Sequence, residues 1–314
     1  MDIQSLLDPE IASMLATMPP FVFSAETLPA IRANRLSLVG QFELSDAVQR
    51  RDHVVPAGAS TPDVTVRVHR PKSASGLLPC VYWMHGGGYI MGTYEMEDLR
   101  FDKLCQSHGV VGVSVEYRLA PEVAYPGPIE DCYAGLRWTW EHAAELGIDR
   151  SRLGIGGASA GAGLAAALAL MARDRGEVPV AFQLLIYPMI DDRMTSRSST
   201  WDVPVWSPAS NRFGWSAYLG ALFGSDDVPA YAAAFRATDL TRLPPTLISV
   251  GTLDGFVDED VEYAQRLNYS GVPVELHVYP GAPHGFDALL PSALLARRAR
   301  RDMEDWLTAR LRTH

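Results

Sequence analysis

The chain has 314 residues, of which 47% are hydrophobic and 20% are charged. This composition is typical of a folded globular protein and excludes a disordered chain, and the length suits one large α/β domain. The 27 basic and 37 acidic side chains give a formal charge of -10. Because an acidic surface repels nucleic acids and anionic membranes, we expect neither as a partner.

The three cysteines, Cys80, Cys105 and Cys132, are widely spaced and follow no metal-ligand pattern. Apolar residues surround Cys80 and Cys132, which predicts buried free thiols in a reducing compartment. The N-terminus lacks the basic and apolar regions of a signal peptide, and no apolar run reaches the roughly 18 residues of a membrane span. We therefore expect a cytoplasmic protein without a membrane span.

The first part of the chain predicts helices followed by one strand. Residues 1 to about 45 carry apolar side chains at helical spacing, with a break at Pro19-Pro20. Residues 64–69 then alternate between valine and polar side chains, which is typical of a strand with one buried face. We expect this strand to form the antiparallel edge of a larger sheet.

From residue 80 onward, short apolar runs alternate with helical stretches. The runs span residues 80–84, 110–115, 153–155, 182–187, 247–250 and 274–278, and helices are predicted near 97–107, 129–146, 160–174, 259–270 and 292–311. Strands that are buried on both faces and alternate with helices indicate an α/β fold. Its central sheet is mostly parallel, with helices on both sides.

Residues 190 to about 235 interrupt this alternation and are rich in aromatic side chains. The segment is too long for an ordinary connection between strands. One interpretation is a pair of additional core helices, and the other is a lid over an active site, built together with the N-terminal helices. Its aromatic residues are Trp201, Trp206, Phe213, Trp215, Tyr218 and Phe223.

A G-x-S-x-G motif at Gly157–Gly161 lies between a predicted strand and an Ala/Leu-rich helix. This strand–turn–helix context is that of a nucleophile elbow, in which the serine occupies a strained turn and its neighbours must be small. Ser159 would then stand at a helix N-terminus, where negative charge is stabilised. The pattern alone arises by chance in roughly one chain in ten, so the context carries the prediction.

His85 and three glycines, Gly86–Gly88, follow the strand predicted at residues 80–84. Consecutive glycines let the backbone approach a ligand and direct N–H groups at it. Together with the N–H of Ala160, this loop would form an oxyanion hole. The alternative is a tight glycine turn beside an incidental histidine.

A serine nucleophile needs a base, and three histidines follow Ser159 in the chain. His277 falls inside a predicted strand and His314 is terminal, whereas His284 lies in a loop after the last predicted strand. Catalytic groups of open α/β sheets gather at the carboxyl ends of strands. We therefore predict His284 as the base.

The acid that orients this histidine is predicted at Asp254, which also follows a strand. Asp258 and Asp260 are rivals, but both fall at or within the next helix, and Asp258 suits a capping role there. The chain order Ser159, Asp254, His284 is the order found in α/β-hydrolases. No metal is expected, because the histidines lack ligand spacing.

With these motifs, the chain resembles the bacterial hormone-sensitive-lipase-like esterases, or family IV carboxylesterases. The resemblance implies an α/β-hydrolase fold in a single domain of residues 1–314, with a cap from about 1–45 and about 190–235. It also implies hydrolysis of small-molecule esters with short to medium acyl chains, without a cofactor. The matching segments are His85–Gly88, Glu116–Glu122, Gly157–Gly161, Asp254–Glu259 and Pro280–Phe286.

The resemblance also assigns individual positions. Gly86, Gly87 and Ala160 match the oxyanion-hole donors, while Glu116–Glu122 and Asp131 match a structural motif beside the site. Many members carry Asp before the serine, where this chain has Ala158, so the bracing of the elbow must differ. Members often dimerise through a sheet edge, which makes a homodimer an expectation of the resemblance alone.

Two alternatives remain from the residues. One is a non-catalytic protein that binds a small ligand on the same scaffold, against which the presence of His284 argues. The other is cleavage of a lactone, amide or carbamate by the same triad, because the pocket and not the triad selects the leaving group.

Overall fold

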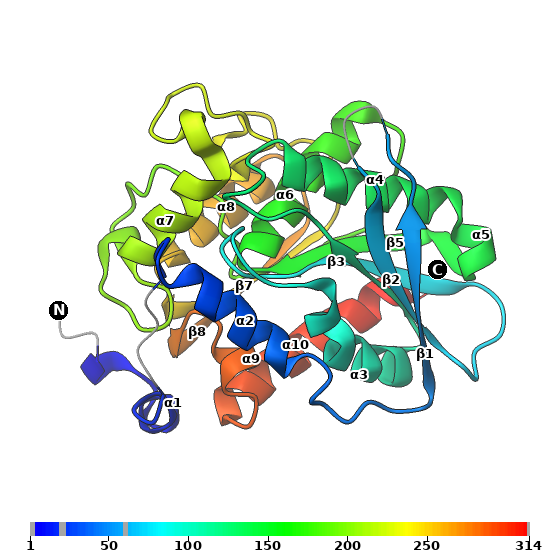
Figure 1. Cartoon of the computed structure of the whole chain (residues 1–314), viewed down its shortest axis with the longest axis horizontal. Helices are drawn as coiled ribbons and strands as arrows, with labels where there is room; N and C mark the ends of the chain where they lie inside the picture. The colour runs from blue at the N-terminus through cyan, green and yellow to red at the C-terminus, as the bar shows by residue number, and fades with distance from the viewer. Residues whose placement is uncertain (1–3, 19–22, 59–61, 313–314) are drawn as a thin grey trace.

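The computed structural model describes residues 4–18, 23–58 and 62–312, so Pro19-Pro20 and His314 lie outside the described residues (Figure 1). Its centre is an eight-stranded sheet in the order β1-β2-β4-β3-β5-β6-β7-β8. The strands are β1 (Val48–Val55), β2 (Val64–Pro71), β3 (Leu78–Met84), β4 (Val111–Glu116), β5 (Ile148–Ala158), β6 (Gln183–Ile186), β7 (Thr246–Leu253) and β8 (Val274–Pro283).

The sheet is mostly parallel, as the alternation of apolar runs and helices predicted. β2 pairs antiparallel with both β1 and β4, and every pair from β4 to β8 is parallel. The prediction that residues 64–69 form the edge was wrong, because β1 lies outside β2. β1 gave no apolar signal: only Val48 and Val55, at its two ends, are buried.

Helices cover both faces of the sheet (Figure 1). The predicted helix 129–146 is divided at His142 into α4 and α5. The α-helices are α1 (Pro9–Leu15), α2 (Leu28–Leu38), α3 (Asp98–His108), α4 (Gly127–Glu141), α5 (Ala143–Leu146), α6 (Ala160–Arg175), α7 (Pro208–Leu219), α8 (Val257–Tyr269), α9 (Phe286–Leu289) and α10 (Leu294–Leu311). Short 3-10 helices span Gln4–Leu6, Tyr94–Glu97, Ser198–Thr200, Gly220–Leu222 and Ala234–Arg236.

The central helix α6 is buried from Ala160 to Ala172. Its alanines and glycines allow it to pack closely against β5 and β6 on one side and α4 on another. This packing fixes the N-terminal end of α6, and with it Ser159, relative to the sheet. All three cysteines are buried and unpaired. In the described part of the chain, no helix has the length and apolar character needed to cross a membrane.

Arg32 attaches helix α2 to the loops after β3 and β4. Arg32 donates hydrogen bonds to the carbonyl oxygens of Ile90 and Ala120, each at 2.7 Å, and forms an ion pair with Glu122 at 2.7 Å. Phe23, just before α2, packs on Trp206 of the aromatic segment with ring centroids 5.0 Å apart. The two segments predicted to form the lid therefore touch each other.

The aromatic segment contributes side chains to the core, as the first interpretation of its sequence expected. Trp215 and Tyr218 of α7 are fully buried and pack around Tyr89, so they belong to the main core. Trp206, in the loop before α7, is buried in the same core and also lies beside the loop of Gly86–Gly88. One part of the segment thus stabilises the fold, and another faces the site described next.

Candidate active site

Ser159 occupies a sharp turn between β5 and α6. Its backbone has φ 57° and ψ -124°, a conformation rare for any residue but glycine. The flanking glycines are required by space: a Cβ on Gly157 would lie 2.2 Å from the Gly161 carbonyl oxygen, and one on Gly161 would lie 2.2 Å from that of Met84. The strand, turn and helix predicted around this motif are confirmed.

The turn is braced by backbone hydrogen bonds, although Ala158 offers no polar side chain. The N–H of Ser159 donates to the Ile186 carbonyl at 2.9 Å, and the Ser159 carbonyl accepts from Gly163 at 2.9 Å and Met189 at 3.2 Å. These bonds connect the serine to β6 and to the first turn of α6. They hold the elbow in place without a polar side chain at position 158.

The structure brings Ser159, His284 and Asp254 into one hydrogen-bonded row. His284 Nε2 lies 2.9 Å from Ser159 Oγ, and His284 Nδ1 lies 2.7 Å from Asp254 Oδ2. Because a carboxylate can only accept, Nδ1 carries the proton and Nε2 is free to accept from the serine hydroxyl. All three side chains are buried, with Asp254 only 1% exposed.

The two rival acids lie apart from this row. Asp258 accepts the N–H of Ser198 at 2.8 Å, so its predicted role as a cap of its own helix is wrong. The helix starts two residues earlier than predicted, at Val257, so Asp258 is already inside its first turn. Asp260 is fully buried on α8, and neither carboxyl oxygen has a hydrogen-bond partner in the described part of the chain.

Two of the predicted oxyanion donors, Gly86 and Ala160, lie next to the serine. A Cβ on Gly86 would lie 2.8 Å from the Ala158 carbonyl oxygen and 3.5 Å from Ser159 Cβ, so this loop runs directly against the elbow. In the described part of the chain, no acceptor binds the N–H of Gly86, Gly87 or Ala160. The N–H of Gly88, the third glycine of the predicted loop, has no acceptor among the described residues either.

His85 holds the glycine loop as a neutral side chain. Its ring stacks on Tyr117 at 4.2 Å, and its Nδ1 lies 2.9 Å from the Gly86 carbonyl, to which it donates. Burial lowers its pKa to about 4. Tyr117 donates its hydroxyl to the His85 carbonyl at 2.8 Å. The histidine before the glycines therefore fixes the loop's shape.

Aromatic rings enclose the imidazole of His284. Tyr187 and Phe256 meet it edge to face, with centroids 4.8 and 5.1 Å away, and the Trp206 ring is 6.4 Å away. Tyr187 has φ 39° and donates its hydroxyl to Asp287 at 2.8 Å. These rings exclude water from the histidine and restrict its rotation.

The remaining family motifs support the site from outside. Arg118 binds Asp131 through its Nε and backbone N–H, at 2.7 and 3.0 Å, and Glu116 accepts the N–H of Tyr94 at 2.8 Å. These contacts fix the loop after β4, consistent with a structural role.

Glu259 is a supporting residue to which sequence reasoning assigned no role. Its buried carboxylate accepts the N–H groups of Ile190 and Asp191 at 3.0 and 3.2 Å, while burial and the charge of Asp191 raise its pKa. This contact connects α8, which follows Asp254, to the start of the aromatic segment. Charged residues are common at helix starts, so the sequence around Glu259 did not indicate this contact.

His277 lies on β8, pairs with Glu275 at 2.7 Å and takes no part in the row of Ser159. Among the described residues, no group of three His, Cys, Asp or Glu side chains is placed to hold a metal ion.

The chain belongs to the α/β-hydrolase-fold family, whose model matches residues 81–288. It is 36% identical to the carboxylesterase NlhH of Mycobacterium tuberculosis, over 89% of this chain and 88% of the relative. It is 32% identical to the esterase LipI of the same organism, over 91% and 89%. Among solved structures, a bacterial heroin esterase superposes with a TM-score of 0.94 at 42% identity, covering 98% of this chain and 99% of the other. These matches confirm the resemblance to hormone-sensitive-lipase-like esterases.

Proposed function

We propose that the protein is a serine carboxylesterase that cleaves small, uncharged esters through an acyl-enzyme. The observation that carries the proposal is the buried row of Ser159, His284 and Asp254, with contacts of 2.9 and 2.7 Å. A serine hydroxyl becomes a strong nucleophile when an oriented imidazole accepts its proton. The similarity to carboxylesterases and esterases over most of the chain supports ester cleavage as the reaction.

In the first step, Ser159 Oγ forms a bond to the ester carbonyl carbon while His284 Nε2 takes the hydroxyl proton. Asp254 keeps the imidazole in the required tautomer and stabilises its positive charge. The carbonyl oxygen becomes negative and accepts hydrogen bonds from the N–H groups of Gly86, Gly87 and Ala160. The bond to the alcohol oxygen then breaks, and His284 gives its proton to the departing alkoxide.

In the second step, water takes the place of the alcohol. His284 removes a proton from the water as its oxygen bonds to the acyl carbon, and the same N–H groups stabilise the second oxyanion. The bond from the acyl carbon to Ser159 Oγ breaks, His284 returns the proton to the serine, and a carboxylic acid leaves. No group besides these residues and water is required.

The segments around residues 1–45 and 190–235 act as the cap of this single domain. The contact of Phe23 with Trp206, and the position of Trp206 against the glycine loop, support this role. The rings that enclose His284 favour uncharged substrates, because an ion would lose its hydration there. Acyl chains of short to medium length are proposed from the family resemblance.

The test compares the wild type with Ser159→Ala on p-nitrophenyl acetate. We expect measurable hydrolysis by the wild type and a loss of at least about 10⁴-fold in kcat for the variant. Near-full activity in the variant would exclude Ser159 as the nucleophile. A p-nitroanilide and a lactone assayed beside the ester show whether the site prefers esters, and faster cleavage of either would contradict the substrate class.

A further inference from the structure

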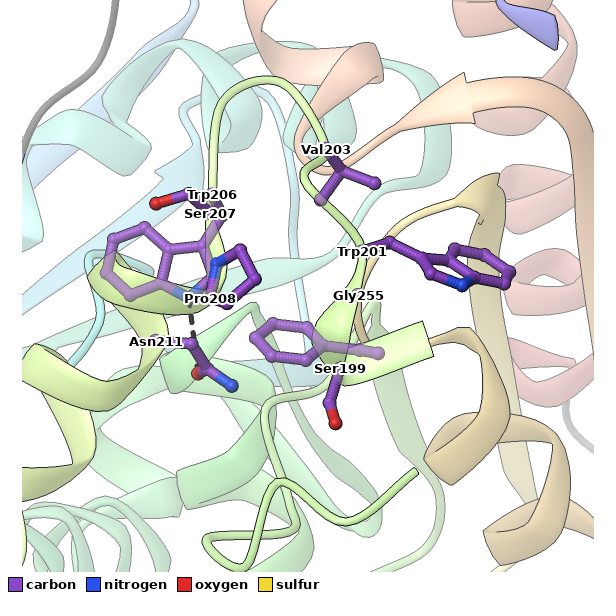
Figure 2. Close-up of a pocket in the computed structure, with 9 residues that line it drawn as sticks. Ser199, Trp201, Val203, Trp206, Ser207, Pro208, Asn211 and Gly255 are labelled. Atoms are coloured by element: carbon purple, nitrogen blue, oxygen red, sulfur yellow. Dashed lines mark hydrogen bonds between the residues drawn. The ribbon is translucent and has the colours of Figure 1, made fainter. Parts of the chain in front are cut away.

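A cavity of about 350 Å³ opens at the edge of the sheet that β1 forms. Its volume lies within the range of about 300–1,000 Å³ that is common for small-molecule sites. By contrast, the cavity beside Trp206 in Figure 2 measures about 10 Å³, which is room for about one water molecule. We call the larger cavity the edge groove, and its polar lining is Gln49, Arg51, His53, Arg70, His142 and Glu145.

The edge groove lies between the sheet and the C-terminal part of α4. β1 contributes Gln49, Arg51 and His53, because alternate residues of a strand point to the same face. Trp138 of α4 lines the other side. In the sheet, β2, β4 and β3 separate β1 from β5, which precedes the serine turn. Figure 1 shows β1 and α5 at the opposite end of the molecule from α7, so the groove is separate from the candidate active site.

Several polar groups of the edge groove are available to a ligand. Among the described residues, the side chains of Gln49, Arg51 and His53 have no hydrogen-bond or ion-pair partner. His142 donates from Nδ1 to the Trp138 carbonyl at 2.9 Å, which leaves its Nε2 for another contact. A guanidinium without a partner suits a phosphate or carboxylate, whose oxygens it can bind in pairs.

The edge groove is positively charged in a protein whose formal charge is -10. Its charged lining consists of the guanidinium groups of Arg51 and Arg70 and the carboxylate of Glu145. Arg70 is held in place by backbone carbonyl oxygens at 2.8 and 2.9 Å. Burial lowers the pKa of His53, and the charge of Arg51 lowers it further. A bound anion would relieve this repulsion between like charges.

We propose that the edge groove binds a small phosphate monoester that carries hydroxyl groups, such as a glycerol or sugar phosphate. A phosphate monoester is close to a dianion at pH 7 and has three terminal oxygens. These oxygens match three donors, Arg51, His53 and the protonated imidazole of His142. Glu145 can only accept, so it suits a hydroxyl group on the rest of the ligand. This site is independent of the proposed esterase function.

Isothermal titration calorimetry with glycerol 3-phosphate, at pH 7 and fixed ionic strength, tests the proposal. We expect one molecule per chain with a Kd of about 1 mM or lower. Glycerol lacks the anion and glycerate carries a carboxylate in its place, so each should bind at least about tenfold more weakly. Glycerate that binds as tightly would overturn the assignment of a phosphate. No binding of glycerol 3-phosphate up to about 10 mM would overturn the site itself.

Arg51→Gln should raise the Kd at least about tenfold, because it removes charge-assisted hydrogen bonds at an exposed position of β1. Arg137→Gln is the matched control. Arg137 is also exposed and precedes Trp138 on α4, but it pairs with Glu141 at 3.6 Å and does not line the groove. Its Kd should stay within twofold of the wild type. Equal losses in the two variants would overturn the proposal, because net charge would then set the affinity.

Nuclear magnetic resonance locates the bound molecule. The indole N–H signal of Trp138, identified by its absence from Trp138→Phe, should shift as glycerol 3-phosphate is added and give the same Kd. The corresponding signal of Trp206 should stay in place, because Trp206 lies beside the glycine loop at the candidate active site. A shift of the Trp206 signal without one of Trp138 would place the ligand at that site and overturn the inference.

Discussion

The floor of the candidate active site, formed by Ser159 and the loop Gly86–Gly88, and its proposed cap are built in different ways. On the floor, the positions of Ser159 and the glycine loop follow from backbone constraints: a Cβ at Gly86, Gly157 or Gly161 would meet a carbonyl oxygen at 2.8 Å or less. In the cap, Trp206 is positioned by side chains distant in the sequence, such as Phe23. We infer that changes in the floor abolish the chemistry, whereas changes in the cap alter which ester is accepted.

The largest expected effect is that of removing the base. His284→Ala should lower kcat for p-nitrophenyl acetate by about 10⁴-fold or more, because among the described residues only His284 is hydrogen-bonded to Ser159 Oγ. His277→Ala is the control, since His277 pairs with Glu275 on β8 and should leave kcat within twofold. Similar losses in both variants would mean that the effect arises from the fold.

A change in the oxyanion loop should have the next largest effect. Gly86→Ala places a methyl group 2.8 Å from the Ala158 carbonyl oxygen, so the loop must move away from Ser159. Loss of an aligned donor costs about 10²–10³-fold in kcat. Gly109→Ala, at a helix end with open space but a φ of 62°, should cost some stability and leave kcat nearly unchanged. A Gly86→Ala enzyme with wild-type kcat would contradict the assignment of this loop.

The buried His85 predicts a pH dependence of stability. Its pKa is about 4 in the folded protein and about 6.5 when unfolded, so between these values the unfolded chain binds the extra proton. The free energy of unfolding should therefore fall by about 3 kcal/mol as the pH drops from 6.5 to 4. When urea unfolding is measured at a series of pH values, His85→Phe should lack this part of the decrease in the free energy of unfolding. Parallel curves of unfolding free energy against pH for the wild type and the variant would contradict the prediction.

Two adjacent buried acids of α8 should affect stability in opposite directions. Glu259→Ala leaves the N–H groups of Ile190 and Asp191 without a partner and should cost about 1–3 kcal/mol. Asp260→Ala removes a buried carboxyl without a described partner and should stabilise the protein at pH 7 by about 1 kcal/mol.

The gain from Asp260→Ala should also depend on pH. Burial raises the pKa of Asp260. Its carboxyl therefore destabilises the folded protein increasingly as the pH rises above the unfolded pKa of about 3.9. The gain should therefore shrink towards pH 4. Urea unfolding at pH 7 and pH 4 measures both variants, and a destabilised Asp260→Ala protein would show that this carboxyl has a partner.

The contrast between floor and cap also explains what the sequence could predict. Apolar runs predicted the parallel strands because these are buried on both faces, and local motifs placed Ser159, Asp254 and His284 at strand ends. β1 was missed because its six central residues show no apolar alternation. The partners of Asp258 and Glu259 were also missed. These partners, Ser198 and Ile190, lie in the segment after β6, so no periodic pattern near the two acids indicates them.

Trp206 shows the same limit more sharply. In the sequence, Trp206 is one of several aromatic residues, and its neighbouring residues do not distinguish it from Trp215. In the structure both tryptophans are buried in one core, but Trp206 also lies against Gly88 of the glycine loop. That difference depends on the path that residues 190–235 take in the fold, which composition and residue spacing do not predict.

The most direct measurement of the central claim is covalent labelling. An uncharged alkyl p-nitrophenyl phosphonate reacts with an activated serine, releasing p-nitrophenol and leaving a stable adduct. Mass spectrometry should find one adduct per chain, located on Ser159, and labelling of His284→Ala should be strongly slowed. No adduct on the wild type, or an adduct at another residue, would contradict the claim that Ser159 is the nucleophile.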